Sequence, residues 1–459
     1  MMTSQADSRL IYIISEQGRF VMGTIHIAYA LNDNYAEMTC VSMCSVLENR
    51  KNAEIVFHLF AEDISRENTE KLNNLCIEQE KSSVIFHDIS IDGELFVTTK
   101  YDGYGSPNLT KETYVRVLMP DLLPELERLL YLDCDTIVVG DLAQLWETDL
   151  EGEFVGMVPD YSLGEKEKKK QILGLERSSI YFNGGVILMD ISKLREYKLS
   201  RIATENVKIL YDTVTSAGME WFADQEVLNY VLQNRIKKLP MRYNSYFWIS
   251  LPCDERIDEC IKALLNPIIV HFIATPKPTE LGNASVLLPD WERYYKYKAM
   301  SPYAAEGDEE KIALYKAREA KTLDALKPCD FHSVRWYCTF FAKQIFELSL
   351  LRYKTDGNGK GITIWGLNAG TWILTVFLAA HGVEVKRIVD GLEGNQGIEV
   401  FDYSVESPEV LRGSSSGTYV MLDMRNYDIA QQVMEQLQIW GYSKGDFYYV
   451  YAPLWEGTD

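Results

Sequence analysis

Two aspartates interrupt the apolar run Leu129-Leu-Tyr-Leu-Asp133-Cys134-Asp135-Thr-Ile-Val-Val139. In an extended strand, residues i and i+2 project to the same side, so both carboxylates are expected to face one divalent cation. Burying two neighbouring carboxylates is costly unless a cation neutralises them. The pattern therefore favours a metal site over the alternative, a polar strand end that enters a turn.

This run belongs to a longer alternation of strands and helices. Short β-rich segments are expected at 24–30, 55–60 and 84–89, with a helix over 36–50 and another that starts at Ser65. Such alternation predicts an α/β fold with a parallel sheet between helices and ligands bound beyond the carboxyl ends of the strands. Residues 1–21 fit this pattern poorly, and either add a strand or precede a start at Met22.

Composition excludes some classes of function. Asp and Glu total 67 against 46 Lys and Arg, and the formal charge of −21 argues against a nucleic-acid partner. The eight cysteines are scattered without a CxxC pair, which indicates reduced thiols rather than a disulfide framework. No apolar run reaches the ~18–20 residues of a membrane span. The chain is therefore expected to be cytoplasmic.

The 459 residues are enough for two or three domains. A charged helix is expected over 308–326 and an aromatic-rich helix over 331–353, which either packs between domains or lies at a membrane interface. Residues 354–361 have the composition of a linker. A second α/β domain then follows, with strands expected at 362–365, 385–389, 418–422 and 447–451.

Other polar motifs accompany the acidic pair in a fixed order. They are Ala30-Leu-Asn32-Asp33-Asn34-Tyr35, Thr113-Tyr-Val-Arg116, Phe182-Asn183-Gly184-Gly185, Trp221-Phe-Ala-Asp224-Gln225 and Ile269-Val-His271 with Lys277. Taken singly, each has a structural interpretation: a turn, a solvated arginine, close backbone approach at two glycines, a helix N-cap at Asp224 and a structural histidine.

Together, over residues 24–280, these motifs resemble glycosyltransferase family 8, a retaining, nucleotide-sugar-using group with the GT-A fold. The resemblance implies a GT-A domain with a mixed, mostly parallel sheet over 24–295, a helical connector over 296–355 and a small Rossmann-like α/β module over 356–459. It also implies transfer of glucose or galactose from a UDP-sugar to a saccharide or lipid-linked acceptor, in the synthesis of lipopolysaccharide or another surface glycan.

The resemblance also assigns roles to single residues. The metal ligands are Asp133, Asp135 and His271, with Mn²⁺ as the expected ion and Mg²⁺ as the alternative. Lys277 clamps the diphosphate, and Gln225 lies at the anomeric face, where an amide is a poor nucleophile. The other donor-binding residues are Ala30, Asn32, Asn34, Tyr35, Arg116, Asp133, Cys134, Asn183, Gly184 and Asp224. Because Gln225 is a poor nucleophile, front-face substitution is favoured, with Asp160 and Asp224 as positioning groups. A covalent role for either aspartate stays open.

The C-terminal module leaves several functions open. Gly366-x-x-x-Gly370 lacks the third glycine of the dinucleotide fingerprint, although Asp390 at a strand end could bind a ribose. A module that docks a partner, mediates oligomerisation or regulates the enzyme is favoured. The alternatives are an oxidoreductase or nucleotide sensor acting through this module, and a silent scaffold of GT-A shape. Peripheral contact with the inner face of a membrane is a further expectation.

Overall fold

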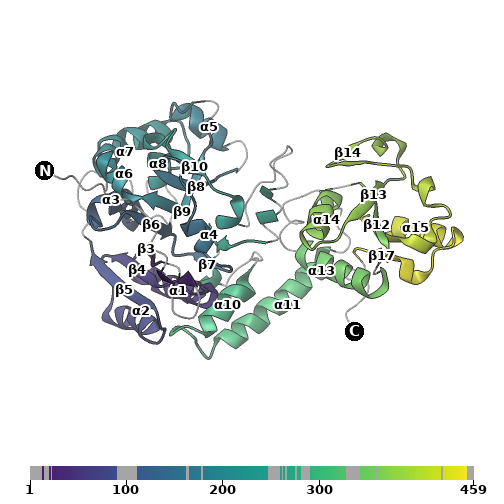
Figure 1. Cartoon of the computed structure of the whole chain (residues 1–459), viewed down its shortest axis with the longest axis horizontal. Helices are drawn as coiled ribbons and strands as arrows, with labels where there is room; N and C mark the ends of the chain where they lie inside the picture. The colour runs from purple at the N-terminus through teal and green to yellow at the C-terminus, as the bar shows by residue number, and fades with distance from the viewer. Residues whose placement is uncertain are drawn as a thin grey trace. The chain divides into compact units, whose positions relative to one another are not determined.

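A computed structural model gives the fold of the chain. It describes residues 13–14, 20–21, 23–89, 111–161, 165–176, 179–246, 259–260, 262–263, 266–273, 277–280, 290–326, 342–357, 359–367, 369–424 and 427–451. The chain divides into two compact units, one made of Met1–Tyr246 and Pro267–Asp308 and the other of Phe247–Asn266 and Glu309–Asp459. Each unit has its own parallel or mixed sheet (Figure 1).

A mixed sheet of seven strands forms the centre of the first unit. Its strands are β3 (Ile25–Leu31), β4 (Ile55–Ala61), β5 (Ser82–Asp88), β6 (Arg128–Leu132), β8 (Val155–Pro159), β9 (Phe182–Asp190) and β10 (Ile236–Lys238). They lie in the order β10-β8-β9-β6-β3-β4-β5. Within this described sheet, β9 runs antiparallel to β6 and β8, and the other pairs are parallel. The predicted mostly parallel sheet is confirmed.

Helices cover this sheet. They are α1 (Ala36–Asn49), α2 (Arg66–Ile77), α3 (Val115–Leu122), α4 (Ala143–Trp146), α5 (Glu165–Ile172), α6 (Ile191–Glu196), α7 (Leu199–Ser216), α8 (Asp224–Val231) and α10 (Trp291–Ala299). Figure 1 shows α6, α7 and α8 grouped beside β8 and β9, and α2 beside β5. The expected helix start at Ser65 is confirmed, because its Oγ accepts a hydrogen bond from Asn68 N at 3.3 Å.

One edge of the sheet collects the carboxyl ends of the parallel strands and the start of β9. The strand β9 bulges there, because residues 184–186 interrupt its register with β8 between Asn183 and Ile187. Asp133, the first residue after β6, donates from its backbone N to Gly185 O at 2.8 Å. The residues that follow β6 are therefore tied to the bulge in β9.

A two-stranded antiparallel sheet continues the chain beyond β6. In it, β7 (Thr136–Val138) pairs with β11 (Ile269–His271), and Thr136 lies opposite His271. Ser245 bridges to this pair from the other side: its N donates to Ile269 O at 2.9 Å, and its O accepts from His271 N at 2.8 Å. Three segments far apart in the sequence are thus locked in register, which brings His271 next to the residues that follow β6.

The second unit contains a smaller parallel sheet. Its strands are β12 (Gly361–Trp365), β13 (Val385–Val389), β16 (Thr418–Leu422) and β17 (Phe447–Tyr449), its helices include α14 (Ala369–Ala380) and α15 (Tyr427–Ile439), and β14 (Glu399–Val400) pairs with β15 (Tyr403–Ser404). The strand order is β13-β12-β16-β17, and all three pairs are parallel. The predicted strands and the βαβ unit of this module are confirmed.

Between the expected domains, the charged helix is present as α11 (Asp308–Leu326), and the aromatic-rich helix is described from residue 342 onward as α13 (Ala342–Arg352). Residues 331–341 of that prediction lie outside the described residues. The predicted linker over 354–361 is wrong at its start, because a π-helical turn, Tyr353–Gly357, continues α13. Tyr353 holds this turn by donating to Lys360 O at 2.8 Å and by packing edge-on against Tyr419.

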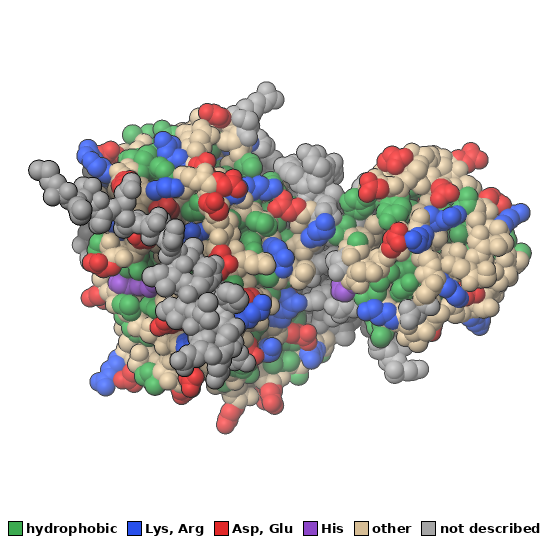
Figure 2. Space-filling model, viewed as in Figure 1, with side chains coloured by type: hydrophobic (Ala, Val, Ile, Leu, Met, Phe, Trp, Pro, Cys, Tyr) green, Lys and Arg blue, Asp and Glu red, His purple; other side chains and the backbone are tan. Residues whose placement is uncertain are grey.

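Other predictions concern the start of the chain, its surface and its cysteines. The short strands β1 (Ile13–Ile14) and β2 (Phe20–Val21) pair with each other outside the seven-stranded sheet. In the part of the chain that the structure describes, every helix is too short or too polar to cross a bilayer. Figure 2 shows acidic and basic side chains interspersed over the described surface on the viewed side. The described thiols Cys40, Cys44, Cys76 and Cys134 are free, as expected, and all four are buried.

Candidate functional site

Asp133 and Asp135 flank a turn between β6 and β7, and the expectation of one continuous strand is wrong. Asp133 O accepts from Thr136 N at 3.2 Å and from Thr136 Oγ1 at 2.8 Å, which closes the turn. The chain changes direction because β6 pairs within the large sheet, whereas β7 pairs with β11. The two carboxylates are therefore brought together by a turn rather than by the alternation of an extended strand.

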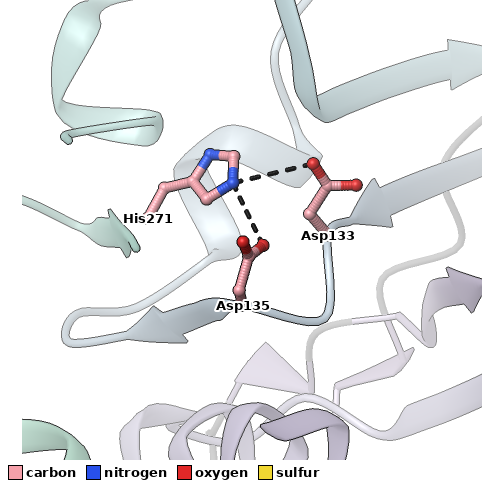
Figure 3. Close-up of side chains that lie close together, drawn as sticks. All are labelled: Asp133, Asp135 and His271. Atoms are coloured by element: carbon pink, nitrogen blue, oxygen red, sulfur yellow. Dashed lines mark ion pairs between the residues drawn. The ribbon is translucent and has the colours of Figure 1, made fainter. Parts of the chain in front are cut away.

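His271, the last residue of β11, completes a cluster with both aspartates (Figure 3). Its Nε2 lies 3.6 Å from Asp133 Oδ2 and 3.1 Å from Asp135 Oδ1. One ligand atom from each of the three residues lies within 4.8 Å of the other two. Two carboxylate oxygens and an imidazole nitrogen form a donor set suited to a divalent cation. The predicted metal ligands are thus brought together, as a candidate metal-binding set.

Arg116 from α3 neutralises one side of this cluster. Its Nη2 lies 2.9 Å from Asp133 Oδ1, and its Nη1 lies 3.0 Å from Asp224 Oδ2 and donates to Gly184 O at 2.7 Å. Burial by itself would lower the pKa of Arg116, but the two carboxylates outweigh it and raise that pKa above its ordinary value. The guanidinium therefore stays charged and joins the acidic pair to the start of α8.

Lys277 neutralises the other side. Its Nζ lies 2.5 Å from Asp135 Oδ2 and donates to Phe272 O at 2.8 Å. Burial favours the neutral form of Asp135, but Lys277 and His271 outweigh burial and hold the pKa of this carboxyl well below its usual range. Asp135 is therefore a carboxylate at neutral pH, as a metal ligand must be.

The two glycines of the β9 bulge leave room for these side chains. A Cβ added at Gly185 would lie 2.2 Å from His271 Cε1 and 2.9 Å from Asp133 Oδ2, and one added at Gly184 would lie 3.2 Å from Arg116 Nη1. The expected close approach is confirmed, but the neighbours are side chains of the site rather than another backbone. Any larger residue at position 185 would force the histidine ring or the β9 bulge to move.

Asp224 is the first residue of α8, and its expected alternative role as N-cap is wrong. The N-cap is Ala223, and the Asp224 carboxylate forms the ion pair with Arg116 instead. Burial raises the pKa of Asp224 to about 7, although Arg116 opposes this shift. The carboxyl group therefore titrates close to neutral pH.

Gln225 and Asp160 lie on the other side of the bulge. Gln225 Oε1 accepts from Gly184 N at 3.1 Å, and its Nε2 donates to Asp160 Oδ2 at 3.4 Å. Asp160, which directly follows β8, also accepts from Tyr246 OH at 3.1 Å. Both ends of the glutamine amide are therefore held, Asp224 and Gln225 lie against Gly184, and Asp160 is joined to them through Gln225.

The predicted nucleotide-binding turn follows β3, the strand next to β6. Cys134 Sγ donates to Ala30 O at 3.1 Å, which joins the end of β3 to the acidic pair. Asn32 Oδ1 accepts from Asn34 N at 3.1 Å and caps the short 3₁₀ turn Asp33–Tyr35, where Tyr35 is half-buried. The residues expected to hold the base therefore lie at the same sheet edge as Asp133.

Three residues at the site escaped sequence analysis. Tyr131 OH donates to Asp133 Oδ1 at 2.8 Å, and the Arg116 guanidinium stacks 4.4 Å from its ring centre. Its position two residues before Asp133 in the strand is a signal that could have identified it. Asn244 contacts His271, which lies more than 25 residues later in the chain. Tyr246 contacts Asp160, which lies more than 80 residues earlier. No local sequence pattern therefore pointed to either residue.

A buried ion pair stabilises the first turn of α8. Lys169 Nζ lies 2.6 Å from Glu226 Oε1, and both side chains are fully buried. Glu226 also accepts from Phe222 N at 2.9 Å and from Tyr181 OH at 3.1 Å. The backbone that presents Asp224 and Gln225 is therefore held by a charged network with no solvent exposure.

In the second unit, the two residues that the sequence offered for a dinucleotide site, Asp390 and Gly366, contact the backbone. Asp390 accepts from Leu367 N at 2.7 Å and from Leu392 N at 2.8 Å, so backbone amides occupy both of its oxygens. Gly366 has φ +128°, and an added Cβ would lie 2.1 Å from Asp423 O. The glycine thus allows the ends of two strands to pack closely.

Comparison with known proteins identifies the family. The model of "Glycosyl transferase family 8" matches residues 26–278. The lipopolysaccharide 1,2-glucosyltransferase of Escherichia coli is 24% identical over 274 residues, which cover 59% of this chain and 75% of that protein. The lipopolysaccharide 1,3-galactosyltransferase of Salmonella typhimurium (strain LT2) is 23% identical over 327 residues, which cover 70% of this chain and 92% of that protein.

A solved structure shows the same fold. The galactosyltransferase LgtC, solved in complex with donor and acceptor sugar analogues, aligns with a TM-score of 0.51 at 23% identity, covering 62% of this chain and all of that one. The family model covers more than half of the chain, and the matched span contains the acidic turn, the β9 bulge and His271. The chain therefore belongs to glycosyl transferase family 8 and is a glycosyltransferase with the GT-A fold.

Proposed function

We propose that this glycosyltransferase moves a hexose, glucose or galactose, from a UDP-sugar to a saccharide or lipid-linked acceptor with retention of configuration. The observation that carries the proposal is the cluster of Asp133, Asp135 and His271 with Arg116 and Lys277 in contact with it. A nucleoside diphosphate gains negative charge as it leaves the sugar. A divalent cation held by carboxylates, together with nearby basic side chains, stabilises that charge. Because the chain carries a net charge of −21, the protein as a whole repels an anionic donor, and this local group of charges must attract the diphosphate.

We propose Mn²⁺ as the cation, with Mg²⁺ as the alternative. The donor set fits a divalent ion, because Asp133 and Asp135 offer oxygen ligands and His271 offers a nitrogen. An imidazole ligand favours Mn²⁺, since Mg²⁺ prefers coordination by oxygen alone. When bound, the ion would withdraw negative charge from the departing diphosphate.

The chain's own residues suggest how configuration is retained. Double displacement needs a nucleophilic carboxylate beneath the anomeric carbon. Gln225, which we place there, is an amide held at both ends, and the Asp224 carboxylate is paired with Arg116. We therefore favour front-face substitution, in which the leaving phosphate oxygen takes the acceptor's proton while Asp160 and Asp224 position the substrate. A glycosyl-enzyme intermediate on either aspartate is the alternative, which mass spectrometry of quenched reactions would reveal.

The relatives suggest the setting of the reaction. Two of them are named for glucosyl and galactosyl transfer in lipopolysaccharide, so we propose a cell-surface glycan as the product. Contact with the inner membrane face would suit a lipid-linked acceptor. The second unit, whose candidate dinucleotide residues serve packing, is proposed to dock a partner or mediate oligomerisation.

The proposal is tested by donor hydrolysis with and without metal. A panel of UDP-sugars, with GDP-glucose as a nucleotide control, is incubated with the enzyme and Mn²⁺, and released nucleotide is measured. We expect UDP-glucose or UDP-galactose to be hydrolysed, and chelation to stop the reaction. Asp135→Asn should lower the rate about 10³-fold, since metal assistance is worth several kcal/mol.

Asp141→Asn is the matched control, because Asp141 follows β7 but pairs with Lys51 at 3.3 Å, away from the cluster. It should retain the wild-type rate. Metal-independent hydrolysis, or near-normal turnover by folded Asp135→Asn, would contradict the proposed metal site.

A further inference from the structure

We propose that Asn244 is a positioning residue that determines which nitrogen of His271 faces the cation. The inference rests on the proposed metal site and extends it to a residue outside the ligand set. Asn244 is fully buried and lies directly after the short 3₁₀ turn Met241–Tyr243. Its side chain stands between Asn183 of the β9 bulge and the ring of His271.

The direction of this hydrogen-bond chain follows from one unambiguous donor. The backbone N of Gly185 can only donate, and it lies 2.8 Å from Asn183 Oδ1. The atom of Asn183 that faces inward is therefore the acceptor oxygen. Asn244 approaches the same oxygen at 2.7 Å, so the atom it presents must be the donor Nδ2.

The other end of the Asn244 amide is then its oxygen, which cannot donate. This Oδ1 lies 2.8 Å from Nδ1 of His271, so Nδ1 must carry the proton. In the neutral ring, Nε2 is consequently the atom with the lone pair, and it points at Asp133 and Asp135 from 3.6 and 3.1 Å. The opposite tautomer would place a proton where a metal bond must form.

Rigid surroundings keep the amide from turning over. Ser245, next in the chain, is bonded to β11 through Ile269 O and His271 N, which sets the spacing between Asn244 and the ring. Tyr246 packs edge-on against the imidazole, with ring centres 6.5 Å apart. A flipped amide would put oxygen against oxygen at Asn183, and buried polar groups without partners are costly. The tautomer of His271 is therefore set by a backbone amide of β9, relayed through two asparagines.

The test compares Asn244→Leu with wild type in two measurements that need no turnover. Electron paramagnetic resonance gives the Mn²⁺ dissociation constant without nucleotide. Groups that orient a ligating histidine typically contribute about 10–100-fold to metal affinity, and we expect a loss in this range. Histidine-selective ¹⁵N NMR reports the tautomer, with the His271 signal assigned from a His271→Gln sample among the six histidines. We expect the wild type to show Nδ1–H and the variant to lose that preference.

Two further variants separate positioning from general loosening. Asn49 also holds β7, donating to Val138 O at 3.0 Å and to Tyr297 OH at 2.8 Å, so Asn49→Leu should lower the melting temperature but leave Mn²⁺ affinity within about twofold. Asn244→Asp keeps an acceptor toward Nδ1–H but sets its second carboxylate oxygen against Asn183 Oδ1, so it should lower the melting temperature and still retain the wild-type tautomer.

The outcomes distinguish the two proposals. A wild type that binds no Mn²⁺ would refute the metal site, and the NMR tautomer would still decide the role of Asn244. A folded Asn244→Leu protein with the wild-type tautomer and the wild-type Mn²⁺ affinity would overturn the inference.

Discussion

Replacing Gly185 with alanine tests the site through one added methyl group. The new Cβ would lie 2.2 Å from His271 Cε1 and 2.7 Å from its Nδ1. Ordinary van der Waals contact begins at 3.4 Å, so the ring or the β9 bulge must move by about 1.2 Å. The same Cβ meets Asp133 Oδ2 at 2.9 Å, which prevents the displaced ring from keeping its place between the carboxylates.

The magnitude follows from that displacement. Overpacking of a well-filled interior costs about 1–3 kcal/mol, so we expect Gly185→Ala to fold with a lower melting temperature. A misplacement of about 1 Å at a reacting centre costs ~10²-fold in rate. Because the ring that moves is the nitrogen ligand, Mn²⁺ affinity should fall together with the rate of UDP-sugar hydrolysis.

The assay pairs this variant with Gly184→Ala. That added Cβ meets Arg116 Nη1 and Asp224 Oδ2 at 3.2 Å each, so a shift of a few tenths of an ångström accommodates it. Mn²⁺ affinity, measured by electron paramagnetic resonance, should stay near wild type in Gly184→Ala and collapse in Gly185→Ala. Equal Mn²⁺ affinity in both variants, with circular dichroism showing both folded, would refute the placement of His271 as a ligand.

Three other perturbations have defined outcomes. Glu226→Gln removes the fully buried carboxylate that pairs with Lys169, so urea denaturation should show a loss of about 3–5 kcal/mol in the free energy of unfolding. His58 lies 3.0 Å from a histidine on each side, and burial, reinforced by these neighbours, lowers its pKa to about 4. The unfolded chain then binds the proton more readily, so the free energy of unfolding should fall as pH drops from about 6.5 to 4, less steeply in His58→Gln. Gly366→Ala, at φ +128° with a carbonyl oxygen 2.1 Å from the new Cβ, should make the second unit sensitive to proteolysis, whereas Gly391→Ala meets open space and should not.

The order of elements and the acidic pair could be read from the sequence because they depend on local patterns. Apolar runs such as 55–60 and the cap at Ser65 reflect short-range periodicity and capping, which each segment carries by itself. The motif series also marked Asp133, Asp135 and His271 as one set, and the structure brings them together.

Tertiary structure alone decided how those residues meet. The carboxylates converge because β6 and β7 pair with different partners, which forces a turn that no alternation of side chains predicts. Asp224 reads as an N-cap until Arg116, more than 100 residues earlier, is placed beside it. Asn244 carries no local signal at all, since its role depends on a bulge in β9 and on the register of β11. Contacts of this kind depend on strand order and on spacing through space, and a sequence encodes these only through the whole fold.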